Sequence, residues 1–296
     1  MSALRCPLVS IGMPVYNCEK TIAASIQSIV NQTFEDWELI VIDDGSRDRT
    51  LTVAREFLDA RVQIVDGQQN LGLPSRLNQA VQLSRGKYFA RMDGDDIAYP
   101  ERLAKQVAFL DQHPAVDLLA TSVSVFNDEA CLLGLRRGPV SHEAICVHPW
   151  SGFPMPHPTW MGKRGWFRAN PYRSDAVRME DKELLFRTYS KSRFARLDEV
   201  LLGYREASLS FSKMLLARRN FVRVLWQASG KHCNPQFALR GTFGQALRAG
   251  LDAVALSSGL GYRLLRHRER PASEQEIARW LDVWQQTTNS APQHTA

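Results

Sequence analysis

Residues 37–43, WELIVID, constrain the fold most, because apolar side chains occupy both alternating faces of this short run. A strand of this kind is typical of a parallel sheet that is covered by helices on both sides. Residues 8–15 (LVSIGMPV) have the same character, and residues 21–31 follow them with isoleucines on one helical face. This pattern predicts buried strands that are each followed by a helix.

The alternation of strand and helix continues along the chain. The expected elements of the first hundred residues are a helix at 50–58, a strand at 61–66, a helix at 73–84 and a strand at 87–92. Further elements are expected as helices at 100–112 and 178–191, a strand at 116–126 and a strand or pair of strands at 194–204, with irregular structure at 127–139 and 147–159. Such alternation indicates an α/β fold with a doubly wound, mostly parallel sheet flanked by helices.

The strand at 87–92 runs into a turn that carries three carboxylates, Asp93, Asp95 and Asp96. Like charges this close raise one another's pKa until a cation relieves them. Carboxylate oxygens suit Mg²⁺ or Mn²⁺, which take further ligands from substrate phosphates and water. On its own the sequence DGDD is equally compatible with a simple turn, because Asp and Gly favour turns at strand ends.

Polar residues follow three of the predicted strands, at Tyr16–Asn17, Asp43–Asp44 and Asp93–Asp95. The carboxyl ends of parallel strands meet at one edge of a sheet, where α/β proteins bind ligands. Neither a GxGxxG motif after the first strand nor a GxxxxGK[ST] motif anywhere is present, which disfavours a dinucleotide-binding Rossmann unit and a P-loop. The edge is therefore expected to hold a ligand of another kind.

The five cysteines are scattered and form no CxxC motif, so the sequence indicates neither a disulfide framework nor a zinc site. The first residues predict a strand and not a signal peptide, and no run of about 18 apolar residues occurs. These features favour a cytoplasmic protein.

Basic charge is concentrated between residues 201 and 270, which contain twelve Lys or Arg and three acidic residues. From residue 208 onward we expect helices interrupted by glycines, and then a polar, disordered tail at 286–296. Residues 211–226 and 243–265 mix apolar and basic side chains. This composition is compatible with an interfacial membrane helix, and equally with a helix that packs on its own domain and exposes a basic face.

Seven segments, taken together, resemble family 2 glycosyltransferases of the glycosyltransferase-A fold. They are PVYN (14–17), QTFEDWELIVIDDGSRDRT (32–50), NLGLPSRLNQA (70–80), YFARMDGDD (88–96), HPTWMGKR (157–164), EDKELLFR (180–187) and LLGYREASLS (201–210). Their order is that of the family. The resemblance covers roughly the first 210 residues and implies a catalytic domain at residues 1–210. The helical basic extension at 211–285 and the tail at 286–296 are expected from composition and charge, because the resemblance does not extend clearly to them.

The resemblance also implies roles for individual residues. Pro14, Tyr16 and Asp44 would hold the nucleotide base, Asp93 would lie near the ribose, and Asp95 would bind the metal ion on the diphosphate. Taken without the resemblance, Asp43 and Asp44 are compatible with an Asx turn.

Asp181 would be the catalytic base, and His157 and Glu180 would lie near the acceptor or the diphosphate. An attacking hydroxyl needs a carboxylate that accepts its proton, and a nucleotide diphosphate leaves readily only when its charge is neutralised. Taken without the resemblance, Glu180 and Asp181 are compatible with acids that stabilise a helix start, and His157 with a packed loop residue.

By this resemblance the chain is expected to be a metal-dependent, inverting glycosyltransferase of bacterial envelope polysaccharide biosynthesis. A second carboxylate on the leaving-group face would allow retention instead, but the sequence offers no strong candidate for it. The donor would be a nucleotide sugar, with UDP as the first expectation and GDP or dTDP open. The acceptor would be a glycan or a lipid-linked glycan at the inner face of the cytoplasmic membrane, where the basic extension could make a peripheral contact; no nucleic-acid partner is expected. The alternatives are a non-catalytic nucleotide-sugar-binding or scaffold protein and a sugar nucleotidyltransferase, which would need a phosphate loop that PVYNCEK does not supply.

Overall fold

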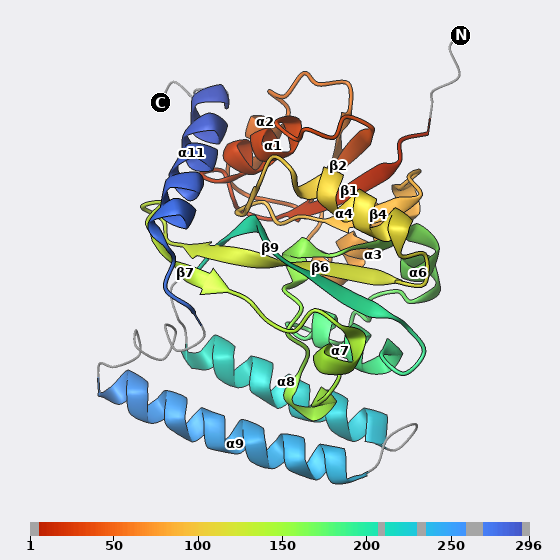
Figure 1. Ribbon diagram of the computed structural model, residues 1–296, viewed down its shortest axis with the longest axis vertical. Helices are drawn as coiled ribbons and strands as arrows, with labels where there is room; N and C mark the ends of the chain where they lie inside the picture. The colour runs from red at the N-terminus through yellow and green to blue at the C-terminus, as the bar shows by residue number, and fades with distance from the viewer. Residues whose placement is uncertain (1–5, 207–210, 230–234, 259–268, 292–296) are drawn as a thin grey trace.

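Nine strands of the described chain form one mixed sheet with helices on both faces (Figure 1). The structure, a computed structural model, describes residues 6–206, 211–229, 235–258 and 269–291. The strands are β1 (Val9–Val15), β2 (Trp37–Asp43), β3 (Val62–Asp66), β4 (Tyr88–Arg91), β5 (Ile97–Ala98), β6 (Leu118–Phe126), β7 (Leu132–Arg136), β8 (Met161–Lys163) and β9 (Phe194–Arg205). The helices are α1 (Ile22–Val30), α2 (Thr50–Ala54), α3 (Leu73–Leu83), α4 (Arg102–Gln112), α5 (His142–Ile145), α6 (Arg164–Ala169), α7 (Glu180–Thr188), α8 (Phe211–Ser229), α9 (Pro235–Ser257) and α11 (Glu274–Ser290), with short 3-10 turns η1 (Pro149–Ser151) and η2 (His157–Thr159).

The first half of the sheet is parallel, in the order β3, β2, β1, β4. Helices connect these strands, so the predicted α/β fold is confirmed. A Cβ atom on Gly12, in the middle of β1, would lie 2.6 Å from Phe89 Cζ and 2.8 Å from Ala80 Cβ. Glycine at this position therefore lets α3 pack directly against the strands.

The two faces of β2 belong to two separate hydrophobic cores. Leu39 and Val41 pack in the core that contains the buried side chains of α1 and α4. Ile40 and Ile42 pack in the core that contains those of α3, α6 and α7. Both faces of the strand are therefore buried, which is the physical reason for its continuous apolar sequence.

The second half of the sheet adds β8, β6, β9 and β5, and β7 pairs with β6. β6 and β9 are parallel, whereas each antiparallel pair includes β5, β7 or β8. The prediction that residues 127–139 are irregular is wrong for 132–136, which form β7. The Asn127 side chain accepts hydrogen bonds from the N–H groups of Glu129 and Cys131 and closes a tight turn, so that the following residues fold back onto β6.

The predicted disordered tail is also wrong in part, because residues 286–290 belong to α11; residues 292–296 lie outside the described part. A capping box at Ser273 and Glu276 starts this helix. Trp280 is fully buried, with its ring 4.5 Å from that of Phe126. Thr287 is buried one turn after Val283 and donates to its carbonyl at 2.8 Å, so the buried face continues into polar sequence.

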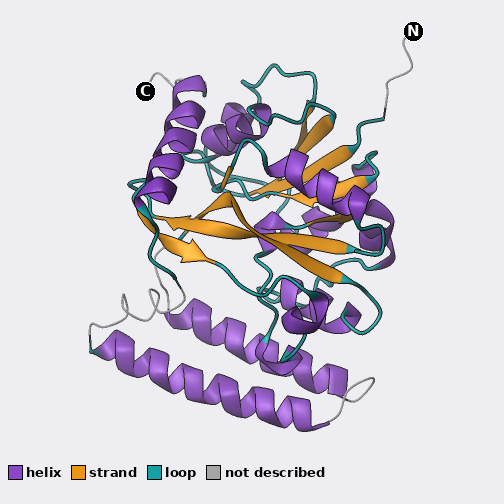
Figure 2. Cartoon of the chain, viewed as in Figure 1, coloured by secondary structure: helices purple, strands orange, loops and turns teal. Residues whose placement is uncertain are grey.

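The two long helices α8 and α9 form a hairpin along one end of the molecule, as Figure 2 shows most clearly. The predicted helical extension is confirmed for the described residues, and Gly241, Gly244 and Gly250 lie within α9. Phe221 and Leu225 of α8 join the core that contains α7, so one face of the hairpin packs on the sheet domain. The proposed domain boundary after residue 210 stays a prediction, since residues 207–210 lie outside the described ranges.

Candidate active site

The acidic turn lies between β4 and β5, at the carboxyl edge of the parallel strands. Carboxylate oxygens of Asp93, Asp95 and Asp96 all lie within 4.8 Å of one another. Burial and the neighbouring charge of Asp93 raise the pKa of Asp95 to about 6, and burial together with Asp95 raises the pKa of Asp96. The three acids are thus brought together, in surroundings that a cation would relieve.

Arg205, the last residue of β9, holds the acidic turn from the opposite side. Its backbone N–H donates to Asp96 Oδ1 at 2.9 Å, and its Nε donates to the Asp95 carbonyl at 3.0 Å. The other carboxylate oxygen of Asp96, Oδ2, is buried and has no hydrogen-bond partner among the described residues. The backbone of the turn is therefore fixed, while Asp96 Oδ2 remains available to a ligand.

The loop after β1 is held by the turn after β2. Three consecutive N–H groups of this loop donate to side chains of the turn and of the first residue of α2: Asn17 to Ser46 Oγ (2.9 Å), Cys18 to Thr50 Oγ1 (2.8 Å) and Glu19 to Asp48 Oδ2 (3.2 Å). Asn17 has a φ of 50°, a conformation that Asn adopts more readily than most residues. The segments PVYN and DDGSRDRT, distant in sequence, thus form one side of the site.

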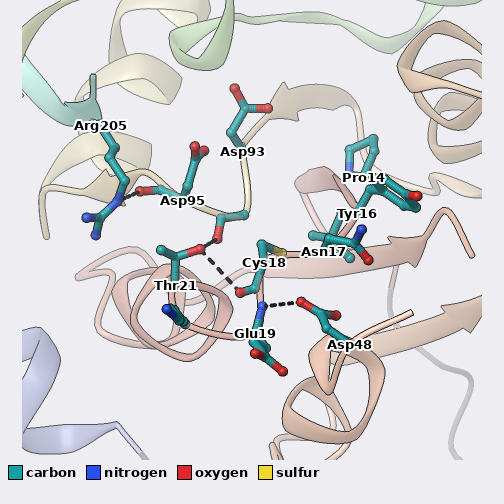
Figure 3. A pocket seen from close by; sticks show the side chains of 13 residues that line it. Pro14, Tyr16, Asn17, Cys18, Glu19, Thr21, Asp48, Asp93, Asp95 and Arg205 are labelled. Carbon is teal, nitrogen blue, oxygen red and sulfur yellow. Dashed lines mark hydrogen bonds between the residues drawn. The ribbon is translucent and has the colours of Figure 1, made fainter. Parts of the chain in front are cut away.

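A pocket of about 450 Å³ opens between this loop and the acidic turn (Figure 3). Asp93 and Asp95 lie on one side of it, and Pro14 and Tyr16 lie on the other. The hydroxyl of Thr21, just before α1, donates to the Gly94 carbonyl at 2.8 Å and ties the two sides together. An exposed aromatic ring opposite a cluster of carboxylates suits a ligand that has both a planar base and metal-bound phosphates.

Arg91 lies between the acidic turn and a buried cluster of side chains, His157, Trp160 and Tyr172. Its side chain is buried, and Nη2 donates to Asp93 Oδ1 at 2.6 Å. Its Nε and Nη1 are buried without a hydrogen-bond partner in the described chain. Two donor nitrogens beside the acidic turn are therefore left for a ligand or water.

His157 lies in this buried cluster. Its Nε2 is 3.0 Å from the Tyr172 hydroxyl, and its ring is 4.4 Å from that of Trp160, edge-on. Burial and the positive charge of Arg91 lower the pKa of His157, so the imidazole is neutral near pH 7. His157 does not line the 450 Å³ pocket. The packed-loop interpretation describes its position, and its contact with an acceptor or a diphosphate stays a prediction.

Glu180 and Asp181 form the first turn of α7. Burial, together with the charge of Asp181, raises the pKa of Glu180 to about 7. The charges of Arg91 and Asp93 also act on Glu180, so the start of α7 lies within electrostatic reach of the acidic turn. Asp181 is half-buried, and neither acid is among the residues that line the pocket with Asp95.

Asp44 was predicted to hold the nucleotide base, and its surroundings differ most from that prediction. Its carboxylate is buried and accepts three hydrogen bonds, from Leu71 N (2.7 Å), Gly72 N (2.9 Å) and Arg76 Nε (2.7 Å). It does not line the pocket. The neighbouring Asp43 forms the Asx turn, since its Oδ2 accepts from the N–H groups of Gly45 and Ser46. Asp44 therefore fixes the loop before α3 in this structure.

Comparison with known sequences decides the family. The sequence profile described as "Glycosyl transferase family 2" matches residues 10–190, more than half of the chain. The chain belongs to glycosyltransferase family 2. This family 2 enzyme is similar to "Putative glycosyltransferase EpsE" of Bacillus subtilis, with 38% identity over 214 residues that cover 70% of this chain and 76% of the relative.

Two further similar proteins are described with a nucleotide sugar. A protein of Escherichia coli named "UDP-Glc:alpha-D-GlcNAc-diphosphoundecaprenol beta-1,3-glucosyltransferase WfgD" is 40% identical over 103 residues, which cover 35% of this chain and 41% of WfgD. The solved structure of the mannosyltransferase PcManGT from Pyrobaculum calidifontis, in complex with GDP-Man and Mn²⁺, superposes with a TM-score of 0.59 and 18% identity over 96% of this chain and 86% of that one. The second likeness shows the fold, and the predicted glycosyltransferase-A fold is confirmed.

The acidic turn of this glycosyltransferase fits a divalent metal ion. Three carboxylates offer oxygen ligands within 4.8 Å of one another, which is the donor set that Mg²⁺ and Mn²⁺ prefer. The buried, unpartnered Oδ2 of Asp96 and the raised pKa of Asp95 both indicate negative charge that the protein does not fully compensate. A bound cation would compensate it.

Several residues of the enzyme's site were not predicted from the sequence. They are Thr21, Asp48, Arg91, Tyr172 and Arg205. Asp48, Arg91 and Arg205 lie inside the segments that resemble the family, and this was the only available signal for them. Their roles depend on contacts between residues that are far apart in sequence, such as Arg205 with the acidic turn, and periodicity does not reveal such contacts.

Proposed function

We propose that this enzyme transfers a sugar from a UDP-sugar to a glycan or lipid-linked glycan, with inversion at the anomeric carbon. The observation that carries the proposal is the cluster of three carboxylates, within 4.8 Å of one another, beside a pocket of about 450 Å³ that Tyr16 also lines. The name of WfgD supports a UDP-sugar and a lipid diphosphate acceptor. The GDP-Man bound by PcManGT keeps a GDP-sugar as the second candidate.

In this proposal the pocket holds the nucleotide diphosphate. Asp95 is the protein ligand of Mn²⁺ or Mg²⁺, Asp93 lies near the ribose, and Pro14 and Tyr16 contact the base. When bound, the cation would neutralise the charge that develops on the departing diphosphate. Asp44 is the assigned residue with the least structural support, because its carboxylate is fully engaged by the loop at residues 71–72 and Arg76.

Asp181 is proposed as the catalytic base. An acceptor hydroxyl oxygen forms the new bond to the anomeric carbon, its proton passes to the Asp181 carboxylate, and the electron pair of the broken bond leaves with the diphosphate oxygen. Proton transfer of this kind contributes about 10²–10⁴ in rate. His157 and Glu180 are assigned to the acceptor or diphosphate side, because both lie within the electrostatic reach of Arg91.

One experiment tests the donor and the stereochemistry together. UDP-, GDP- and dTDP-sugars are added with and without Mn²⁺, and thermal stabilisation of the protein and slow hydrolysis of the donor are measured. We expect the largest metal-dependent stabilisation from a UDP-sugar, and a product anomer opposite to that of the donor by NMR. Metal-independent stabilisation would contradict the assigned metal ligand, and a retained anomer would contradict inversion.

A further inference from the structure

The α9 helix exposes a row of large apolar side chains. Leu239, Phe243, Leu247, Leu251 and Val254 are each between 54% and 74% exposed. Their spacing of four, four, four and three residues places them on one side of the helix, where they form what we call the α9 stripe. Single exposed apolar residues are common on protein surfaces, whereas an aligned row of five indicates an interaction surface.

The opposite side of α9 is the side that packs. A Cβ on Gly241 would lie 2.2 Å from Leu225 Cδ1 of α8, so the two helices are in close contact there. Asp252 forms an ion pair with Arg218 of α8, and Ala238 is fully buried. The hairpin is therefore held by one side of α9, and the α9 stripe is not needed for that packing.

Positive charge accompanies the exposed apolar residues. Arg219 and Arg223 of α8 and Arg240 and Arg248 of α9 are exposed. Residues 211–229 and 235–257 contain six Lys or Arg and only one acid, Asp252, which is paired with Arg218. Exposed apolar residues also occur on α8, at Leu215, Leu216 and Trp226.

We propose that the α8–α9 hairpin binds the surface of an anionic lipid bilayer, with the α9 stripe between headgroups and acyl chains and the arginines at lipid phosphates. Within the described ranges no helix combines the length and the apolarity that are needed to cross a bilayer. A helix with one apolar side and basic residues lies in the plane of a membrane surface instead. A second copy of the chain fits this face poorly, because it would bring the same excess of positive charge, six Lys or Arg against one acid in residues 211–229 and 235–257.

The inference goes beyond the proposed sugar transfer and is tested without it. The full chain, in EDTA and without donor, is sedimented with vesicles of phosphatidylcholine alone or of phosphatidylcholine with phosphatidylglycerol. We expect binding to the anionic vesicles that weakens as salt is added. The variant Phe243→Glu/Leu247→Glu should lower the partition coefficient at least about tenfold, since it places two charges where apolar groups would be buried. Arg219→Gln and Arg223→Gln should each lower it about fivefold.

The matched control is Leu58→Glu, because Leu58 is 94% exposed but lies outside the hairpin. It should bind the vesicles as the wild-type chain does. All variants should keep the wild-type melting temperature and the metal-dependent stabilisation by donor, which separates this test from the catalytic proposal. The proposal is overturned if the wild-type chain does not bind anionic vesicles, or if the double variant binds them equally well. It is also overturned if sedimentation velocity shows a wild-type dimer that the double variant loses, since the α9 stripe would then be a contact between copies.

Discussion

The acidic pocket and the α8–α9 hairpin place charged and apolar groups in opposite ways. Around the pocket the charged groups of Asp96 and Arg91 are buried and fixed by hydrogen bonds. On the hairpin, arginines and large apolar side chains such as Phe243 are exposed together. Burying charge costs stability unless a partner compensates it, and exposing apolar surface gives no stability to the chain alone. Each region therefore suits a ligand, and the ligands that we propose differ: a metal-bound nucleotide sugar for the pocket and a lipid surface for the hairpin.

The largest expected effect separates catalysis from binding within the first region. Asp181→Asn should lower the transfer rate by about 10²–10⁴, because the acceptor hydroxyl loses its proton acceptor. Donor affinity should stay unchanged, since Asp181 does not line the pocket. Transfer and donor binding are measured on the same preparation, with Asp66→Asn as a control, because Asp66 forms an exposed ion pair with Arg55. Transfer at the wild-type rate would remove Asp181 from the proposed role.

The next effect concerns the contact between the hairpin and the sheet domain. Phe221→Ala should lower the free energy of unfolding of the hairpin by about 3–5 kcal/mol, because a fully buried ring would leave a cavity. Hydrogen exchange should then show lost protection in α8 and α9 and retained protection in β1, β2 and β4. Leu215→Ala, on the exposed part of the same helix, should change neither. Equal loss of protection in the hairpin and the strands would show that they unfold as one unit.

A smaller effect depends on pH. The pKa of Glu180 is about 7 in the folded protein and 4.5 for the free side chain, so the folded state favours the protonated form. Below pH 4.5 the carboxyl is neutral in both states; as pH rises through 7, the stability that this carboxyl contributes is lost. Glu180→Gln stays neutral, and should therefore exceed the wild-type stability by about 3 kcal/mol above pH 7 and match it at acidic pH.

Urea unfolding of metal-free protein across this pH range measures the difference. Glu35→Gln, at an exposed position, should follow the wild-type curve at every pH. If the free energies of unfolding of the wild-type chain and Glu180→Gln changed with pH in parallel, Glu180 would have an ordinary pKa. That result would contradict the burial of its carboxyl at the start of α7.

The smallest expected effect tests whether the α9 stripe contributes to the packing of the protein. Leu247→Gln should change the free energy of unfolding by no more than about 0.5 kcal/mol, because its side chain contributes little to packing. The measurement is the urea midpoint of the full chain without lipid. A loss of several kcal/mol would mean that the α9 stripe is covered by the protein itself, and the comparison between the two regions would fail.

The fold was largely predictable because its strands are buried on both faces. β2 shows this best, since its alternate residues supply two different cores and leave a continuous apolar sequence. β7 was not predicted, because its pairing depends on a turn closed by Asn127 and not on its own composition. The end of α11 was not predicted either, because Thr287 is a polar residue that becomes buried only through the position of Trp280 and Val283.

The site was predictable where each residue follows a strand. Pro14, Tyr16, Asp93 and Asp95 line one pocket, since parallel strands end at a common edge. The surroundings of Asp44 were not predictable, because its three hydrogen bonds come from a loop and the start of α3, more than 25 residues away in sequence. The surroundings of Arg91 were not predictable for the same reason, since Tyr172 and Glu180, which act on it electrostatically, are distant in sequence.

The most direct test of the account is calorimetric titration of a UDP-sugar into the wild-type chain and into Asp95→Asn, each with and without Mn²⁺. The account predicts that the wild-type chain binds the donor far more tightly with Mn²⁺, and that Asp95→Asn loses this metal-dependent gain. Equal donor affinity in all four titrations would contradict a metal site at the acidic turn and, with it, the proposed reaction.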